Sequence, residues 1–195
     1  MTNNMGFTRI LCFFCFLMVS TISLSAQSGV VFRYGISTTS FKDVKGDSHF
    51  GSQLGVDVMI EDYTFYMLPG IHYYRLNLID GQGGGIYNKT DDKYLDGLKF
   101  KLLLGKRIGQ KDSKLQAKVY GGSTIIYANQ VSDGIVDSIN IDEFKPIVFT
   151  GSIGATLIYD FLSIDLNYER GFSNLIKDRA DSNPSNWVLS FGIFL

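Results

Sequence analysis

Apolar and polar residues alternate with a period of two along most of the chain after residue 26. The even-numbered residues from Val30 to Ile36 are apolar, whereas the odd-numbered residues from Arg33 to Thr39 are polar or small. Successive side chains of a β-strand point to opposite faces, so this alternation predicts strands with one apolar and one polar face. The same pattern returns between residues 162 and 169 and in the last residues before the end at Leu195. The chain is therefore predicted to be all-β.

Other runs alternate less cleanly but are rich in β-forming residues, and with them the prediction comes to eight strands. One of these runs contains Pro69-Gly70, which predicts a bulge or a bend because proline cannot donate a hydrogen bond to a neighbouring strand. The predicted strands are Gly29–Phe41, Phe50–Glu61, Tyr63–Leu78, Leu95–Ile108, Leu115–Tyr127, Ile147–Tyr159, Leu162–Phe172 and Asn186–Leu195.

The connections between these strands alternate between long and short. The long ones are Lys42–His49, Ile79–Tyr94, Ala128–Pro146 and Ser173–Ser185, and the short ones are Asp62, Gly109–Lys114 and Asp160–Phe161. Membrane barrels have short periplasmic turns and longer extracellular loops, and their first and last strands must pair because a free strand edge is costly in lipid. The sequence therefore predicts an eight-stranded antiparallel up-and-down transmembrane β-barrel.

Eight strands enclose an interior that side chains can fill. The alternation assigns one set of charged residues to the inward face, namely Arg33, Asp57, Lys99, Lys101, Arg107, Lys118, Asp165 and Glu169. We expect Arg33 and Lys118 to pair with Asp57, Asp165 or Glu169, which would leave no open channel. The alternative is a secreted barrel of the lipocalin type, which holds a small ligand among inward-facing apolar residues.

The N-terminus has the three parts of a secretory signal peptide. Arg9 precedes an apolar run from Ile10 to Val19, and a stretch of small and polar residues follows up to Gln27. We predict a cleaved signal peptide over residues 1–26, a barrel domain over residues 27–195, and location in the outer membrane of a Gram-negative bacterium. Both cysteines, Cys12 and Cys15, lie inside the predicted signal, so cysteine chemistry is excluded from the barrel domain.

Composition adds little beyond this picture. The formal net charge of −1 gives no argument for a nucleic-acid partner, since nucleic-acid-binding proteins usually carry a strong basic patch. The 15 Phe, 11 Tyr and 21 Gly residues suit a membrane barrel, in which aromatic girdles ring the wall. We predict that the outer face of the barrel wall contacts outer-membrane lipid.

The chain offers no convincing catalytic, cofactor or metal site. Its two histidines, His49 and His72, are distant in sequence, lack a suitably placed serine, and are interpreted as rim and wall residues. The glycine-rich stretch that begins at Gly81 lacks the lysine and helix of a phosphate-binding loop. The acidic residues of the longest loop, among them Asp133 and Asp137, do not have the spacing of an EF-hand. The protein is predicted not to be an enzyme.

Short motifs resemble the PorT-like outer-membrane β-barrel family. They are Tyr34-Gly35, the run Leu-Pro-Gly-Ile-His-Tyr-Tyr at Leu68–Tyr74, and the terminal Phe-Gly-Ile-Phe-Leu. The resemblance extends over essentially all of the chain after the signal, and the small OmpA- and OmpX-type barrels share the architecture. Membership implies an outer-membrane barrel, and the family's namesake assists a protein secretion system.

These observations leave more than one function open. The first hypothesis is a structural or surface-interaction role, with Ile79–Tyr94 and Ala128–Pro146 as the loops that contact protein partners. The alternatives are a small-molecule carrier or narrow pore, a lipid-modifying barrel enzyme, and an accessory component of a secretion system.

Overall fold

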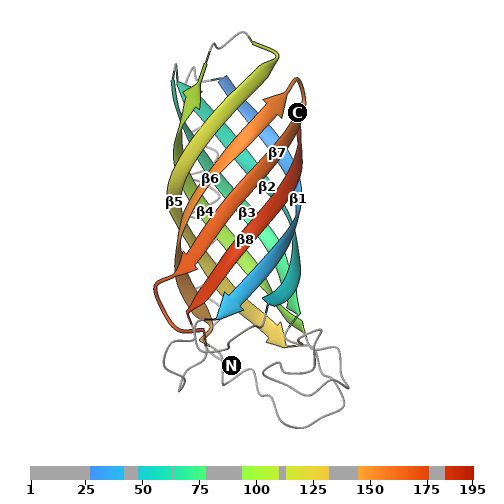
Figure 1. Ribbon diagram of the computed structural model, residues 1–195, viewed down its shortest axis with the longest axis vertical. Helices are drawn as coiled ribbons and strands as arrows, with labels where there is room; N and C mark the ends of the chain where they lie inside the picture. Colours follow the sequence, from blue (N-terminus) through green and yellow to red (C-terminus); the bar gives the residue numbers. More distant parts are fainter. Residues whose placement is uncertain are drawn as a thin grey trace, which may run out of the picture.

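A computed structural model describes residues 27–41, 48–62, 64–77, 94–109, 113–131, 145–175 and 183–195. These residues form a closed barrel in which each strand is antiparallel to the next (Figure 1). The strands are β1 (Gln27–Phe41), β2 (Ser48–Asp62), β3 (Phe65–Asn77), β4 (Tyr94–Ile108), β5 (Leu115–Val131), β6 (Ile147–Tyr159), β7 (Leu162–Gly171) and β8 (Pro184–Phe194). The predicted fold class is confirmed, while the predicted signal peptide and most of the two loops Ile79–Tyr94 and Ala128–Pro146 lie outside the described residues.

The barrel closes through pairing of its first and last strands. Arg33 on β1 lies opposite Gly55 on β2 and opposite Gly192 on β8. Beyond the end of β8, the N–H of Leu195 donates to the carbonyl oxygen of Val30 at 2.9 Å, and the reverse bond measures 3.4 Å. Every strand therefore has a hydrogen-bonded neighbour on both sides, as a barrel in lipid requires.

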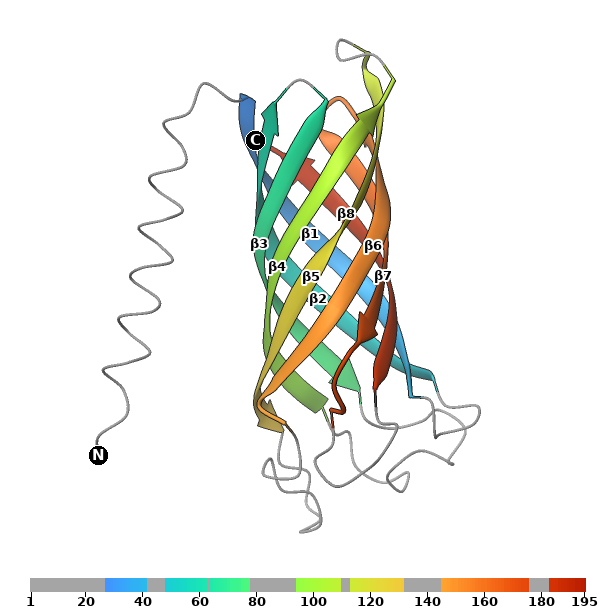
Figure 2. The same cartoon turned by 90° about the vertical axis from the view of Figure 1, so that its left-hand side faces the viewer.

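The two ends of the barrel differ. The strand ends that flank the β2–β3, β4–β5 and β6–β7 connections lie at one end of the barrel together with the C-terminus (Figure 2). We call this the short-turn end. At the β6–β7 turn, Asp160 has a φ of 56°, a left-handed conformation that aspartate tolerates better than most residues. The strand ends that flank the other connections lie at the opposite end, which we call the long-loop end. By analogy with membrane barrels, we expect the short-turn end to face the periplasm.

The register differs from expectation at two places. The predicted bulge at Pro69-Gly70 is wrong: Asp57 pairs with Gly70 and Ile60 with Met67, so the register of β2 and β3 is the same on both sides of the proline. A missing N–H weakens a ladder without requiring an extra residue, which explains why the register is kept. A shift occurs instead between Asp96 and Gly97, where β4 pairs with β5.

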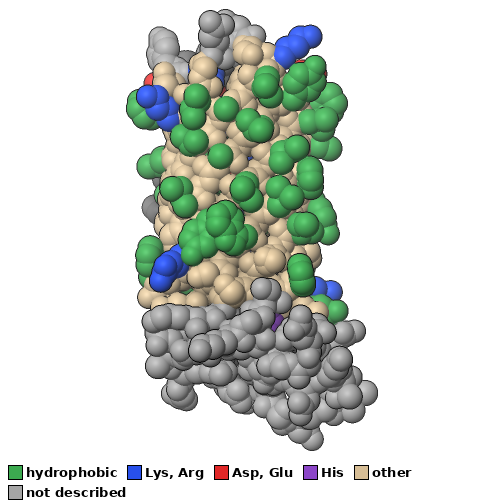
Figure 3. All heavy atoms as spheres, in the orientation of Figure 1, with side chains coloured by type: hydrophobic (Ala, Val, Ile, Leu, Met, Phe, Trp, Pro, Cys, Tyr) green, Lys and Arg blue, Asp and Glu red, His purple; other side chains and the backbone are tan. Residues whose placement is uncertain are grey.

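The two faces of the wall have opposite chemistry. On β7, Leu162, Ile164 and Leu166 are about half exposed, whereas Ser163, Asp165, Asn167 and Glu169 are buried inside the barrel. On the face displayed in Figure 3, hydrophobic side chains are spread over the wall, and lysine and arginine side chains lie near its two ends. The arrangement is the reverse of the lipocalin type and matches a wall that faces lipid. Among the described residues there is no helix with the length and hydrophobicity needed to span a bilayer.

Candidate functional site: the charged interior

Charged and polar side chains fill much of the barrel interior. All eight charged residues that the alternation assigned to the inward face are buried there: Arg33, Asp57, Lys99, Lys101, Arg107, Lys118, Asp165 and Glu169. Each of them meets a side chain of opposite charge at one of three levels along the barrel. This part of the sequence-based prediction is confirmed.

At the middle level, one guanidinium group joins two carboxylates. Nε of Arg33 lies 2.7 Å from Oδ2 of Asp57, and Nη1 lies 3.3 Å from Oδ2 of Asp165. Asp57 also contacts Nε2 of His72 at 2.8 Å. Asp165 accepts hydrogen bonds from the hydroxyls of Tyr120, at 2.9 and 3.0 Å, and Thr156, at 2.6 Å. Each buried carboxylate thus has a charged partner and at least one further polar contact, which limits the cost of removing it from water.

At the second level, nearer the long-loop end, two lysines share one carboxylate. Nζ of Lys99 lies 2.7 Å from Oε2 of Glu169, and Nζ of Lys101 lies 3.9 Å from Oε1. The side-chain amides of Asn167 and Asn186 also donate to Glu169, at 3.0 and 3.4 Å. The carboxylate is therefore held by strands β4, β7 and β8 together.

At the third level, near the short-turn end, Glu61 bridges two cations. Its carboxylate lies 3.0 Å from Nη1 of Arg107 and 2.7 Å from Nζ of Lys118. Nζ of Lys118 also lies 2.9 Å from Sδ of Met59. Met59 belongs to a cluster of buried side chains with Tyr66, Leu68, Leu103, Tyr120 and Ile158. The expected partners of Arg33 are confirmed, but those of Lys118 are wrong because its partner is Glu61.

Glu61 was missing from the predicted inward set although the sequence carries a signal for it. Asp57 and Glu61 are separated by an even number of residues on one strand, so their side chains must share a face. Extending the alternation of β2 by four residues would have placed Glu61 inside.

Both histidines face the interior and are fully buried. His72 lies on β3 and is thus a wall residue, as interpreted, but its side chain is directed into the interior. Tyrosines occur on both faces of β3, so the sequence pattern does not reveal which face His72 is on. The strand register does, because His72 pairs with Gly55, which is on the inward face of β2. His49 lies near the long-loop end, as expected, but its side chain also points inward. The described residues contain no group of three or more His, Cys, Asp or Glu side chains that would hold a metal ion.

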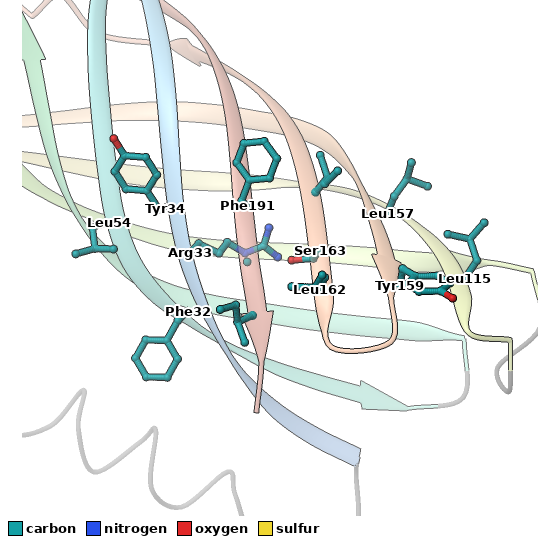
Figure 4. A pocket seen from close by; sticks show the side chains of 13 residues that line it. Phe32, Arg33, Tyr34, Leu54, Leu115, Leu157, Tyr159, Leu162, Ser163 and Phe191 are labelled. Carbon is teal, nitrogen blue, oxygen red and sulfur yellow. The ribbon is translucent and has the colours of Figure 1, made fainter.

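One small cavity lies among the described residues of the interior. A cavity of about 20 Å³ lies near the long-loop end, between Tyr74, Lys99 and Leu175. This volume is close to the space required by one water molecule. Two larger hollows, of about 690 and 870 Å³, are lined mainly by outward-facing side chains. Figure 4 shows the smaller of these two, in which Phe32, Tyr34 and Phe191 contribute to the lining.

Comparisons with known proteins establish the fold. No family model and no curated protein sequence matches the chain. Among solved structures, the outer membrane enzyme PagL is similar with a TM-score of 0.54 and 14% identity, over 84% of this chain and 98% of PagL. Neisserial surface protein A is similar with a TM-score of 0.52 and 11% identity, over 85% of this chain and 96% of that protein. The fold is thus that of small outer-membrane barrels, and the apolar wall agrees with the predicted outer-membrane location.

Proposed function

We propose that the protein is a sealed outer-membrane barrel with a structural or surface-interaction role, and that it is not an enzyme. The observation that carries this proposal is the network of buried ion pairs that crosses the interior at three levels. The strands would then serve as a rigid support for the long connections at one end, and the lumen would not be a route for solutes.

The energetics of the interior favour a sealed barrel over a narrow pore. A continuous passage for solutes would require Arg33 to leave Asp57 and Asp165, and Lys99 to leave Glu169. These groups are at most 5% exposed. Separating such pairs leaves uncompensated buried charges, and each broken pair costs about 3–5 kcal/mol. The cavity between Tyr74, Lys99 and Leu175, of about 20 Å³, is also too small for a carried molecule larger than water.

The proposed interaction surface is the long-loop end. The predicted loops Ile79–Tyr94 and Ala128–Pro146 join β3 to β4 and β5 to β6, and the flanking ends of these strands lie there. Loops on a rigid scaffold are common positions for binding residues. The resemblance to PorT-like proteins adds the alternative that the partner of these loops belongs to a secretion system.

The position of the two histidines supports a role without catalysis. An enzyme that modifies lipids needs its acid–base groups within reach of the lipid. Both histidine side chains are fully buried in the interior, where neither lipid nor bulk solvent contacts them.

Conductance in planar bilayers tests the sealed barrel. We expect the purified protein to give no large, stable conductance steps under conditions in which a reconstituted porin does. Steps that persist in high salt would contradict the proposal and favour the pore alternative.

Epitope tags test which end of the barrel is available to partners. A tag inserted between residues 79 and 93 should bind antibody on intact cells. A matched tag between residues 110 and 112 should bind only after the outer membrane is permeabilised. The opposite result would place the long connections in the periplasm and remove the basis for a surface-interaction role.

A further inference from the structure

The larger of the two lipid-facing hollows lies over strands β3, β4, β5 and β6. It has a volume of about 870 Å³. Its outward lining includes Phe65, Leu104, Lys106, Val119, Gly121 and Ile153. Phe65, Leu104 and Ile153 project from the wall and are 61–68% exposed. These side chains form the sides of a groove whose floor is the β5 backbone.

The strand register explains why the wall is hollow here. Leu104 on β4 lies opposite Gly121 on β5, and Gly121 lies opposite Ile153 on β6. Two large side chains therefore stand on either side of a residue that has none. A Cβ atom added to Gly121 would meet only the carbonyl oxygen of Ser152, at 3.6 Å, which is an ordinary contact. Close packing within the wall therefore does not require glycine at this position.

A cation lies at the rim of the groove. Lys106 is near the short-turn end of β4, is exposed, and has its Nζ 6.0 Å from the ring centroid of Phe65. Lys106 forms no ion pair with a carboxylate in the described part of the chain. Arg75 also faces outward, but its charge is neutralised by Asp96, whose Oδ1 lies 2.7 Å from Nε of Arg75. An ammonium group beside an aromatic ring thus remains available to an anion from outside the protein.

The smaller hollow lacks this feature. Its lining contains one cation, Arg33, which is 3% exposed and paired with carboxylates in the interior. Both hollows are apolar, so the available positive charge is the property that distinguishes them. An occupant of the larger hollow should therefore combine an apolar chain with a negative group near one end.

We propose that this hollow binds one glycerophospholipid, with an acyl chain across Gly121 and the lipid phosphate at Lys106. The acyl chain fills the space between Leu104 and Ile153, and the phosphate accepts a charge-assisted hydrogen bond from the lysine. Lys106 lies near the short-turn end, so the lipid belongs to the periplasmic leaflet in the expected orientation. The inference concerns the wall and does not depend on whether the loops bind a protein partner.

Native mass spectrometry of the full-length mature protein tests the site. The protein is extracted from bilayers of phosphatidylethanolamine and phosphatidylglycerol, and the retained lipids are counted. We expect one retained phospholipid on the wild type. Gly121→Leu fills the groove and should abolish retention. Lys106→Gln should reduce retention about fivefold, the effect of one cation near a membrane surface, and Lys106→Arg should keep it.

Leu162→Phe is the matched control because it adds bulk to the smaller hollow, and it should retain lipid as the wild type does. Heat-modifiable gel mobility verifies that each variant is folded. Equal retention by the wild type, Gly121→Leu and Lys106→Gln overturns the proposal, as does retention of uncharged diacylglycerol as strong as that of phospholipid. A lipid-free dimer that Gly121→Leu abolishes also overturns it, because the occupant is then a second copy of the chain.

Discussion

The inner and outer faces of the barrel wall use the same strands in opposite ways. Lys101 and Leu102 are neighbours on β4, yet Lys101 is 7% exposed and points inside, whereas Leu102 is 49% exposed and points outward. Inside, a charged residue is tolerated because a particular partner compensates its charge. Outside, a residue is tolerated because it carries no charge that lipid would have to solvate. The loss of stability caused by a substitution on the inner face should therefore depend on which partners it leaves unpaired. On the outer face, the loss should depend on the depth of the residue in the membrane.

Removal of Arg33 should have the largest effect. Arg33→Ala leaves Asp165 without its cation and Asp57 with His72 alone, at positions that are 5% exposed or less. We expect the free energy of unfolding to fall by about 3–5 kcal/mol, the usual cost of breaking a buried pair by removing one partner. Urea unfolding from lipid vesicles, followed by fluorescence of the single tryptophan Trp187, measures this change.

The control combines Arg33→Ala with Asp165→Asn, which removes one of the unpaired carboxylates. This double variant should be more stable than Arg33→Ala alone. If Arg33→Ala cost less than 1 kcal/mol, the central ion pairs would contribute little and the contrast between the faces would fail.

Leu102→Arg tests the outer face and should have the next largest effect. The residue lies near the middle of β4, so its arginine would be exposed to hydrocarbon. The expected cost is about 2–4 kcal/mol near the midplane of the membrane. The same unfolding assay measures it. The comparison variant is Lys101→Leu, which should disturb the interior charges but leaves Glu169 with Lys99 at 2.7 Å. A harmless Leu102→Arg together with failed assembly of Lys101→Leu would show that the faces are assigned the wrong way round.

Arg75→Ala should have the smallest effect although its ion pair has good geometry. Nε and Nη2 of Arg75 donate to the two carboxylate oxygens of Asp96, at 2.7 and 2.9 Å. The arginine side chain is 47% exposed, so water or lipid headgroups can replace the interaction. We expect no measurable change in the urea midpoint. A loss as large as that of Arg33→Ala would mean that burial is not the source of the difference between the two pairs.

The sequence was sufficient to predict the fold because the alternation is strong on most strands. All eight predicted strands are present, and the bounds of β6 agree at both ends. That Asp165 and Glu169 share one face follows directly from parity along β7. The alternation alone did not distinguish inside from outside, and the structure resolves this by placing the charges within a closed barrel.

The sequence pattern was silent or misleading where parity is hidden or where partners come from distant strands. Tyrosines on both faces of β3 obscured the inward position of His72. The pairing of Lys118 with Glu61 joins β5 to β2, which are not adjacent in the barrel, so no local pattern specifies it. The register shift between Asp96 and Gly97 was not predicted because no proline lies there to indicate an irregularity. The hollow at Gly121 also depends on the register of three strands, which the sequence alone does not determine.

A spin-label scan along β7 tests the central claim most directly. Single cysteines at Leu162, Ser163, Ile164, Leu166, Asn167 and Tyr168 avoid the charged positions. Labels at the four outward positions should show high accessibility to oxygen, which dissolves in lipid. Labels at Ser163 and Asn167 should show low accessibility both to oxygen and to a water-soluble nickel complex, because the interior is filled. High nickel accessibility at these two positions would reveal an open lumen, and high oxygen accessibility there would reverse the faces; either result would contradict the account.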